Sequence, residues 1–158
     1  MPDWISHMLI GLILAKMFNL KRKSLVVLGA LLPDFIIKIS TLGFFVDMPL
    51  SLYWFLVPGH LPIGLILITI FITPFFLTRF KATFTLITIG WMSHVLADLS
   101  TRFFMNNPQG MLLFPLSWRM FSYQLIWPEE YYIAIIILGP LYIGILAFEK
   151  LKSKPVIA

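Results

Sequence analysis

Five apolar stretches separated by short polar connections dominate the chain, at residues 4–20, 25–46, 61–78, 83–99 and 131–148. A helix of about 18 residues is about 27 Å long, close to the hydrocarbon thickness of a bilayer. The pattern therefore predicts an all-α fold: a polytopic membrane bundle of about five transmembrane helices, in which residues 1–158 form a single integral membrane domain.

Two connections are longer than simple turns. Residues 47–59 contain Pro49 and Pro58 and are expected to form an irregular outer connection. Residues 100–130 lie between the fourth and fifth spans and combine turn residues with aromatic ones such as Trp118 and Phe121. Because aromatic side chains favour the headgroup level of a bilayer, this second segment is predicted to be interfacial or re-entrant.

Composition and charge agree with this interpretation. Only 12% of the residues are charged, against roughly 25% in soluble domains, which excludes a water-soluble fold. The cations cluster after the first, third and fifth stretches, at Lys21-Arg22-Lys23, at Arg79 and Lys81, and at Lys150, Lys152 and Lys154. Since cytoplasmic loops carry the excess of Lys and Arg, we expect an integral protein of the plasma membrane with its N-terminus outside and its C-terminus cytoplasmic.

The net charge of +5 does not indicate nucleic-acid binding, because the cations form no basic surface interleaved with exposed aromatic side chains. Cysteine is absent. Any metal site must therefore use nitrogen and oxygen ligands.

The three histidines, His7, His60 and His94, all lie in or at the edge of apolar stretches. An ionisable side chain inside a membrane costs at least about 2.5–3.5 kcal/mol and needs partners. His94 and Asp98 are four residues apart, share one helix face and can converge on one ion. Imidazole nitrogen and carboxylate oxygen suit zinc, with manganese or iron as alternatives. A structural hydrogen bond within the bundle explains this pair equally well.

Asp34 follows Pro33 in mid-helix, where the proline removes a backbone hydrogen bond and frees a carbonyl one turn back, near Gly29. Polar backbone is thereby exposed beside a carboxylate. The competing explanation is an ion pair between Asp34 and Lys38, four residues further on.

Depth in the membrane connects these candidates. Under the predicted topology His7, His60 and Asp98 lie near the outer ends of their spans. His94 lies one turn deeper and Asp34 nearer the middle. Four helices are therefore expected to meet in a cavity open to the outer side.

The pattern resembles the YdjM-like, LexA-regulated family of membrane-bound metal-dependent hydrolases. The matching pieces, which together cover residues 7 to about 123, are His7 with Gly11, the Leu-Pro-Asp at Asp34, His60 opening a span, Ser93-His94-Val95-Leu96-Ala97-Asp98, and the glycine-to-arginine segment at residues 110–121. The chain departs from the family at Ile36, where a second acid is common, and at Phe55-Leu56, where a His-Arg pair is common.

The same order of residues resembles, more distantly, the metal cluster of zinc-dependent phospholipases C. That resemblance implies one metal ion surrounded by Asp34, His60, His94 and Asp98, with Asp98 bridging to a second ion held with the help of His7.

The function expected from these features is a membrane-embedded hydrolase in which one or two divalent ions, most simply zinc, activate water. It would cleave a phosphoester or ester bond of a lipid or other amphiphile, and no side chain is assigned as catalytic. Arg102 and Arg119 are candidate contacts for a substrate phosphate, or anchors at the interface. Two other classes fit the same residues: a small ion- or proton-coupled transporter, and a noncatalytic membrane protein with structural His/Asp pairs.

Overall fold

The computed structural model describes residues 4–42, 57–76, 79–102 and 110–152. Within this part the chain is all-α, as predicted, and its one β feature is an isolated bridge between Thr101 and Ile126. The predicted ends of the second and third spans, most of the 47–59 connection and the turn at residues 106–108 lie outside the described residues.

The helices follow the predicted stretches with shifted ends. They are α1 (Trp4–Met17), α2 (Lys23–Leu42), α4 (Pro62–Ile72), α5 (Phe80–Asp98) and α6 (Tyr131–Lys152), with the short 3-10 turns η2 (Val57–His60), η3 (Thr73–Phe75) and η5 (Pro128–Glu130). The first helix ends before residue 20 because Asn19 adopts a left-handed conformation, with φ of 51°. Pro74 lies in η3, where the regular helix has given way to 3-10 geometry.

One described helix is both long and apolar enough to cross a membrane, namely α6, with a mean hydropathy of 2.1 in its most apolar window. Helix α1 and the helix over Pro62–Phe75 are apolar but shorter. Helices α2 and α5 are long, and they carry the ionisable residues Asp34, His94 and Asp98.

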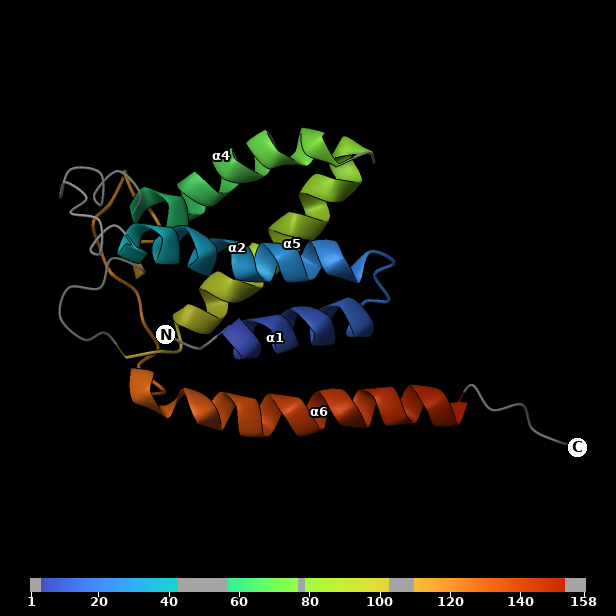
Figure 1. Cartoon of the computed structure of the whole chain (residues 1–158). Coiled ribbons are helices and arrows are strands. Elements are labelled where there is room, and N and C mark those ends of the chain that lie inside the picture. The colour runs from blue at the N-terminus through green and yellow to red at the C-terminus, as the bar shows by residue number, and fades with distance from the viewer. Residues whose placement is uncertain (1–3, 43–56, 77–78, 103–109, 153–158) are drawn as a thin grey trace, which may run out of the picture.

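Helix α2 packs against α1 and α5, while α6 packs against α1 and α4 against α5 (Figure 1). Helices α1, α2 and α6 lie nearly parallel, with α6 on the outer side of α1, while α5 crosses α2 obliquely and leads back from α4. A small apolar core of Leu25, Leu65, Ile87 and Trp91 fills the space between α2, α4 and α5.

Glycines determine how closely α5 approaches α2. A Cβ atom on Gly90 would overlap the carbonyl oxygen of Val26, and one on Gly29 would overlap that of Ile87. Helix α1 also lies close to α2 at Gly11, where an added Cβ atom would be only 3.2 Å from the Cβ of Ala30. The backbones of α1, α2 and α5 therefore lie close together, because small residues let helices approach each other where they cross.

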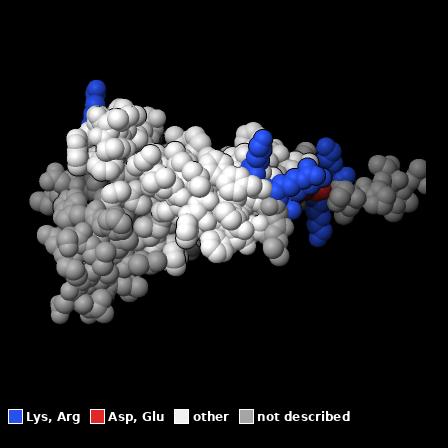
Figure 2. Space-filling model, turned by 90° about the horizontal axis from the view of Figure 1, so that it is seen from above, with Lys and Arg blue, Asp and Glu red and all other residues white. Residues whose placement is uncertain are grey.

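The two ends of the bundle differ in charge. The α1–α2 turn, the start of α5 and the last turn of α6 lie at the same end (Figure 1). Most of the Lys and Arg atoms gather there (Figure 2). An ion pair between Lys16 and Glu149 joins α1 to α6 at this end. The start of α1, η2 and the last turn of α5 lie at the opposite end.

Residues 110–127, part of the segment predicted to be interfacial or re-entrant, form an irregular strap against the end of α5. The amides of Tyr123 and Leu125 donate to the carbonyls of Leu99 and Ser100, at 2.6 and 2.9 Å. The Ser122 hydroxyl donates to the Thr101 carbonyl at 2.7 Å. The strap thus pairs with the carbonyls of the residues that directly follow α5.

Candidate metal centre

The structure brings all five predicted His and Asp residues together at the end of the bundle opposite the cation clusters. His7 comes from α1, Asp34 from α2, His60 from η2, and His94 and Asp98 from the last turns of α5. Their exposed fractions are only 0–4%. The expected cavity open to the outer side is therefore replaced by a buried cluster, because the rings of His7 and His60 pack directly on the ring of His94.

His94 is at the centre of the cluster. Its Nδ1 donates a hydrogen bond to the backbone carbonyl of Ala30, 2.6 Å away on α2. A carbonyl can only accept, so Nδ1 carries a proton, and in the neutral form of the ring the lone pair is at Nε2. A second partner that fixes the tautomer in this way is typical of metal-ligating histidines.

Three ligand atoms form a compact triangle. Nε2 of His94 lies 3.4 Å from Nε2 of His60 and 3.3 Å from Oδ2 of Asp98. Nε2 of His60 lies 3.1 Å from the same carboxylate oxygen. A tetrahedral zinc site with metal–ligand distances of about 2.0–2.1 Å has edges of about 3.3 Å. The triangle therefore has the dimensions of one face of such a site.

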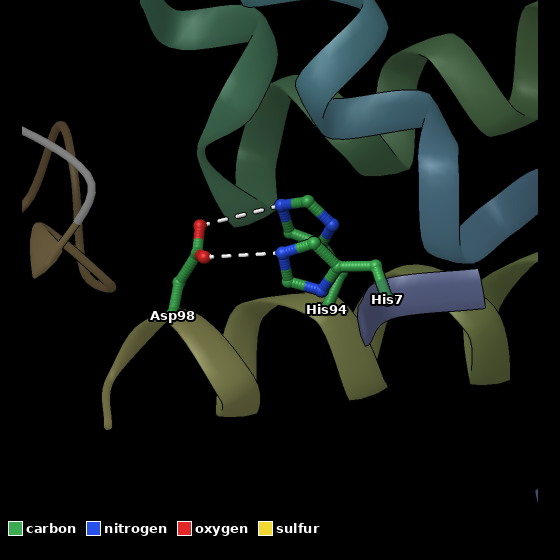
Figure 3. A group of neighbouring side chains, drawn as sticks. All are labelled: His7, His94 and Asp98. Atoms are coloured by element: carbon green, nitrogen blue, oxygen red, sulfur yellow. Dashed lines mark ion pairs between the residues drawn. The ribbon is translucent and has the colours of Figure 1, made fainter. Parts of the chain in front are cut away.

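His7 and Asp34 flank this triangle. The ring of His7 stacks on that of His94 at a centroid distance of 3.7 Å, and its Nε2 lies 3.4 Å from Oδ1 of Asp98 (Figure 3). Asp34 approaches from the α2 side, with Oδ1 3.9 Å from Nε2 of His94. The Nζ of Lys38, the competing partner of Asp34, lies 3.9 Å above the ring of Trp4.

The same cluster contains buried polar atoms that have no hydrogen-bond partner among the described residues. Six of the eight buried side-chain nitrogen and oxygen atoms that lack a hydrogen-bond partner among the described residues belong to this cluster, in His7, Asp34, His60 and Asp98. Each such atom costs about 1–3 kcal/mol when nothing satisfies it, and few occur in native proteins. These residues can hold a metal ion.

Two overlapping sets of ligands meet in the cluster. One contains His7, His94 and Asp98, the other Asp34, His60 and His94, and in each set the ligand atoms lie within 4.8 Å of one another. Both sets use His94. Because its Nδ1 is bound to Ala30, His94 has one nitrogen left for a metal, and one lone pair serves one ion. The geometry fits one ion better than two.

The two arginines predicted to contact a substrate make other contacts. The Nε of Arg102 donates to the Gln124 carbonyl at 2.9 Å, and its guanidinium lies 4.8 Å from the centre of the Trp127 ring. Arg102 thus fastens the strap to the end of α5. Arg119 is exposed, with its guanidinium 5.6 Å from the centre of the Phe121 ring.

Sequence reasoning missed the Ala30 carbonyl, because it placed the free backbone group near Gly29. The available signal was the pair of small residues Gly29 and Ala30 on α2 facing Gly90 on α5, which allows the two backbones to approach. Scanning models of known protein families and searching curated proteins and solved structures found no match to this chain.

Proposed function

We propose that this protein is a membrane-embedded, metal-dependent hydrolase of the YdjM-like family, acting on an ester or phosphoester bond of a lipid or other amphiphile. The observation that carries the proposal is the buried triangle of His60, His94 and Asp98, with edges of 3.1–3.4 Å. A donor set of two imidazoles and one carboxylate with a remaining open position is typical of catalytic zinc sites. Manganese or iron would suit the same ligands.

Membrane embedding is supported by the outer helix and by the charge distribution. Helix α6 has no buried residue, and large apolar side chains such as Ile136, Leu141 and Phe148 are exposed along it. The cation clusters gather at one end of the bundle. Both features favour a bundle of about five helices that crosses the plasma membrane with its cation-rich end in the cytoplasm and the His/Asp cluster toward the outer leaflet.

Each residue of the cluster has a distinct role in this proposal. His60, His94 and Asp98 hold the ion. His7 orients Asp98 through the second carboxylate oxygen, and Asp34 is the base that accepts a proton, since its Oδ1 lies near the ligands but lacks a hydrogen-bond partner. When bound, the ion polarises the scissile carbonyl or phosphoryl group and lowers the pKa of water.

A small pocket next to the cluster supports the choice of substrate. It has a volume of about 170 Å³ and lies between α1, the end of α5, the strap and the start of α6. Its walls include Ser6 and Ala97, the chain neighbours of His7 and Asp98, and the hydroxyl-bearing Ser100 and Thr101. Because residues such as Ile10, Ile126 and Ala134 make the lining mostly apolar, the pocket suits an apolar part of a phosphate-bearing amphiphile. Arg102, which lies over the Trp127 wall, and Arg119 remain predicted contacts for its phosphate.

The test is metal content followed by hydrolysis. Protein purified in detergent should retain about one equivalent of a transition metal, measured by elemental analysis. His94→Ala and Asp98→Ala should lose the metal and lose hydrolysis of a fluorogenic short-chain phospholipid. Ser93→Ala, which changes only a hydroxyl bonded to the Gly90 carbonyl beside His94, is the matched control and should keep both.

Freshly purified wild-type protein without metal would overturn the hydrolase proposal. That result would favour a proton-coupled transporter or a noncatalytic protein, because both use the His and Asp side chains without a resident ion.

A further inference from the structure

The end of the bundle opposite the His/Asp cluster carries a large excess of positive charge. Helix α1 ends there, α2 begins there, and the last turns of α6 are joined to α1 by the ion pair between Lys16 and Glu149 (Figure 1). Glu149 is the one acidic residue in the stretches 16–23 and 146–152. The same stretches contain six cations, which we call the basic junction: Lys16, Lys21, Arg22, Lys23, Lys150 and Lys152.

Two cations of the basic junction lie next to each other. The Lys16 ammonium pairs with the Glu149 carboxylate, and the side chain of Lys23 contacts Lys16 from the start of α2. This contact lowers the pKa of Lys23 from its ordinary value, because a neighbouring cation disfavours the charged form. An ammonium group only donates hydrogen bonds, so neither lysine satisfies the other. One carboxylate thus balances two adjacent cations, and a further anion would remove the surplus charge.

The other residues of the junction increase this surplus. Lys21, Arg22 and Lys152 are exposed, and none of the three forms an ion pair within the part of the chain that the structure describes. Lys and Arg atoms surround the acidic atoms at this end of the molecule (Figure 2). Several cations close together create a positive potential that attracts and concentrates anions.

Large apolar side chains are exposed among the same cations. Met17 and Phe18 in the α1–α2 turn are 68% and 65% exposed, and Phe148 and Leu151 at the end of α6 are each 67% exposed. A small soluble anion gains nothing from these apolar side chains. An anionic phospholipid contacts both kinds of side chain, because its phosphate pairs with cations and its acyl chains cover apolar surface.

We propose that the basic junction binds the phosphate of an anionic phospholipid, whose acyl chains lie against Met17, Phe18 and Phe148. This inference goes beyond the proposed hydrolysis, because the junction and the candidate metal centre lie at opposite ends of the bundle. In the proposed orientation the junction is at the cytoplasmic leaflet, where anionic lipids attract basic segments that adjoin membrane spans.

The first experiment measures the preference for the anionic headgroup. Full-length protein freed of co-purified lipid is titrated in detergent with dioleoyl phosphatidylglycerol or dioleoyl phosphatidylcholine, and native mass spectrometry measures the bound lipid. Phosphatidylglycerol should bind more tightly. Lys23→Gln should reduce this preference about fivefold, the factor expected for one cation beside anionic headgroups. Lys23→Arg is the matched control and should keep it. Lys21→Gln provides a second neutralised variant, with the same expected loss, if Lys23→Gln does not fold.

The second experiment locates the lipid and tests the role of its acyl chains. A photoreactive benzophenone amino acid replaces Phe18 or, as the control, Ile137, which is exposed on α6 away from the junction. In nanodiscs with equal amounts of the two lipids, adducts at Phe18 should be enriched in phosphatidylglycerol, whereas adducts at Ile137 should match the bulk composition. Glycerol phosphate, which lacks acyl chains, should not displace the lipid.

Four results would overturn the proposal. They are equal binding of the two lipids, equal losses in Lys23→Arg and Lys23→Gln, displacement by glycerol phosphate, and phosphatidylglycerol enrichment at Ile137 as strong as at Phe18. The metal centre is tested independently, since His94→Ala should lose metal and hydrolysis but keep the preference for phosphatidylglycerol.

Discussion

Replacing Gly90 by alanine tests whether the close crossing of α2 and α5 holds the candidate metal centre together. The three atoms nearest to the added Cβ would all be backbone atoms: the Val26 carbonyl oxygen, the Ala30 nitrogen and the Gly29 Cα. None of these can move aside as a side chain can, so α5 must shift away from α2. The shift would also lengthen the 2.6 Å hydrogen bond from His94 to the Ala30 carbonyl.

The magnitude follows from these two effects. Overpacking of a well-packed interior costs about 1–3 kcal/mol. Loss of the partner of a buried polar group costs about another 1–3 kcal/mol. We therefore expect Gly90→Ala to lower the free energy of unfolding by about 2–6 kcal/mol, measured by titration from native detergent into SDS. The variant should also bind metal more weakly, because the tautomer of His94 is no longer fixed.

Gly144→Ala is the matched control. Nothing lies within 4 Å of a Cβ added at Gly144, on the exposed helix α6. Alanine is favoured over glycine in a helix by about 0.5–1 kcal/mol, so this variant should be neutral or slightly more stable. The reasoning is refuted if Gly90→Ala and Gly144→Ala have the same stability and metal affinity.

Three further predictions address the centre, the strap and the topology. His7→Ala should weaken metal binding about 10–100-fold without abolishing it, as expected of an outer-shell partner, and complete loss, as in His94→Ala, would make His7 a direct ligand. Arg102→Gln should release the strap, so hydrogen exchange at the amides of residues 123–126 should accelerate, and unchanged exchange would show that Arg102 does not anchor them. Reporter fusions after Lys23 and after Lys154 should both report the cytoplasm, and a split result would contradict the proposed orientation.

The hydrophobic pattern predicted the existence and order of the helices well, because an apolar stretch of helical length has few alternatives once polar connections bound it. The same pattern placed the ends of the helices less accurately. The turn at Asn19 ended α1 early, and α6 continued to Lys152 because charged residues at a helix end do not interrupt the backbone pattern.

The identity of the five cluster residues was also accessible from the sequence, since ionisable side chains in apolar stretches are rare enough to be conspicuous. The contacts that these residues make could not be predicted from the sequence. Helical spacing relates His94 to Asp98, but the approach of His60 and His7 to the same carboxylate depends on where α1 and η2 lie.

The sequence by itself therefore determined an all-α chain with cation-rich connections after alternate helices, and a short set of candidate ligands, because these depend on local periodicity and burial energy. Only the tertiary structure decided that one ring, His94, is shared by both ligand sets, that its tautomer is fixed by the Ala30 carbonyl, and that Arg102 holds the strap. Those properties depend on distances between helices. They follow from the close approach at Gly29 and Gly90, which no pattern within a single helix contains.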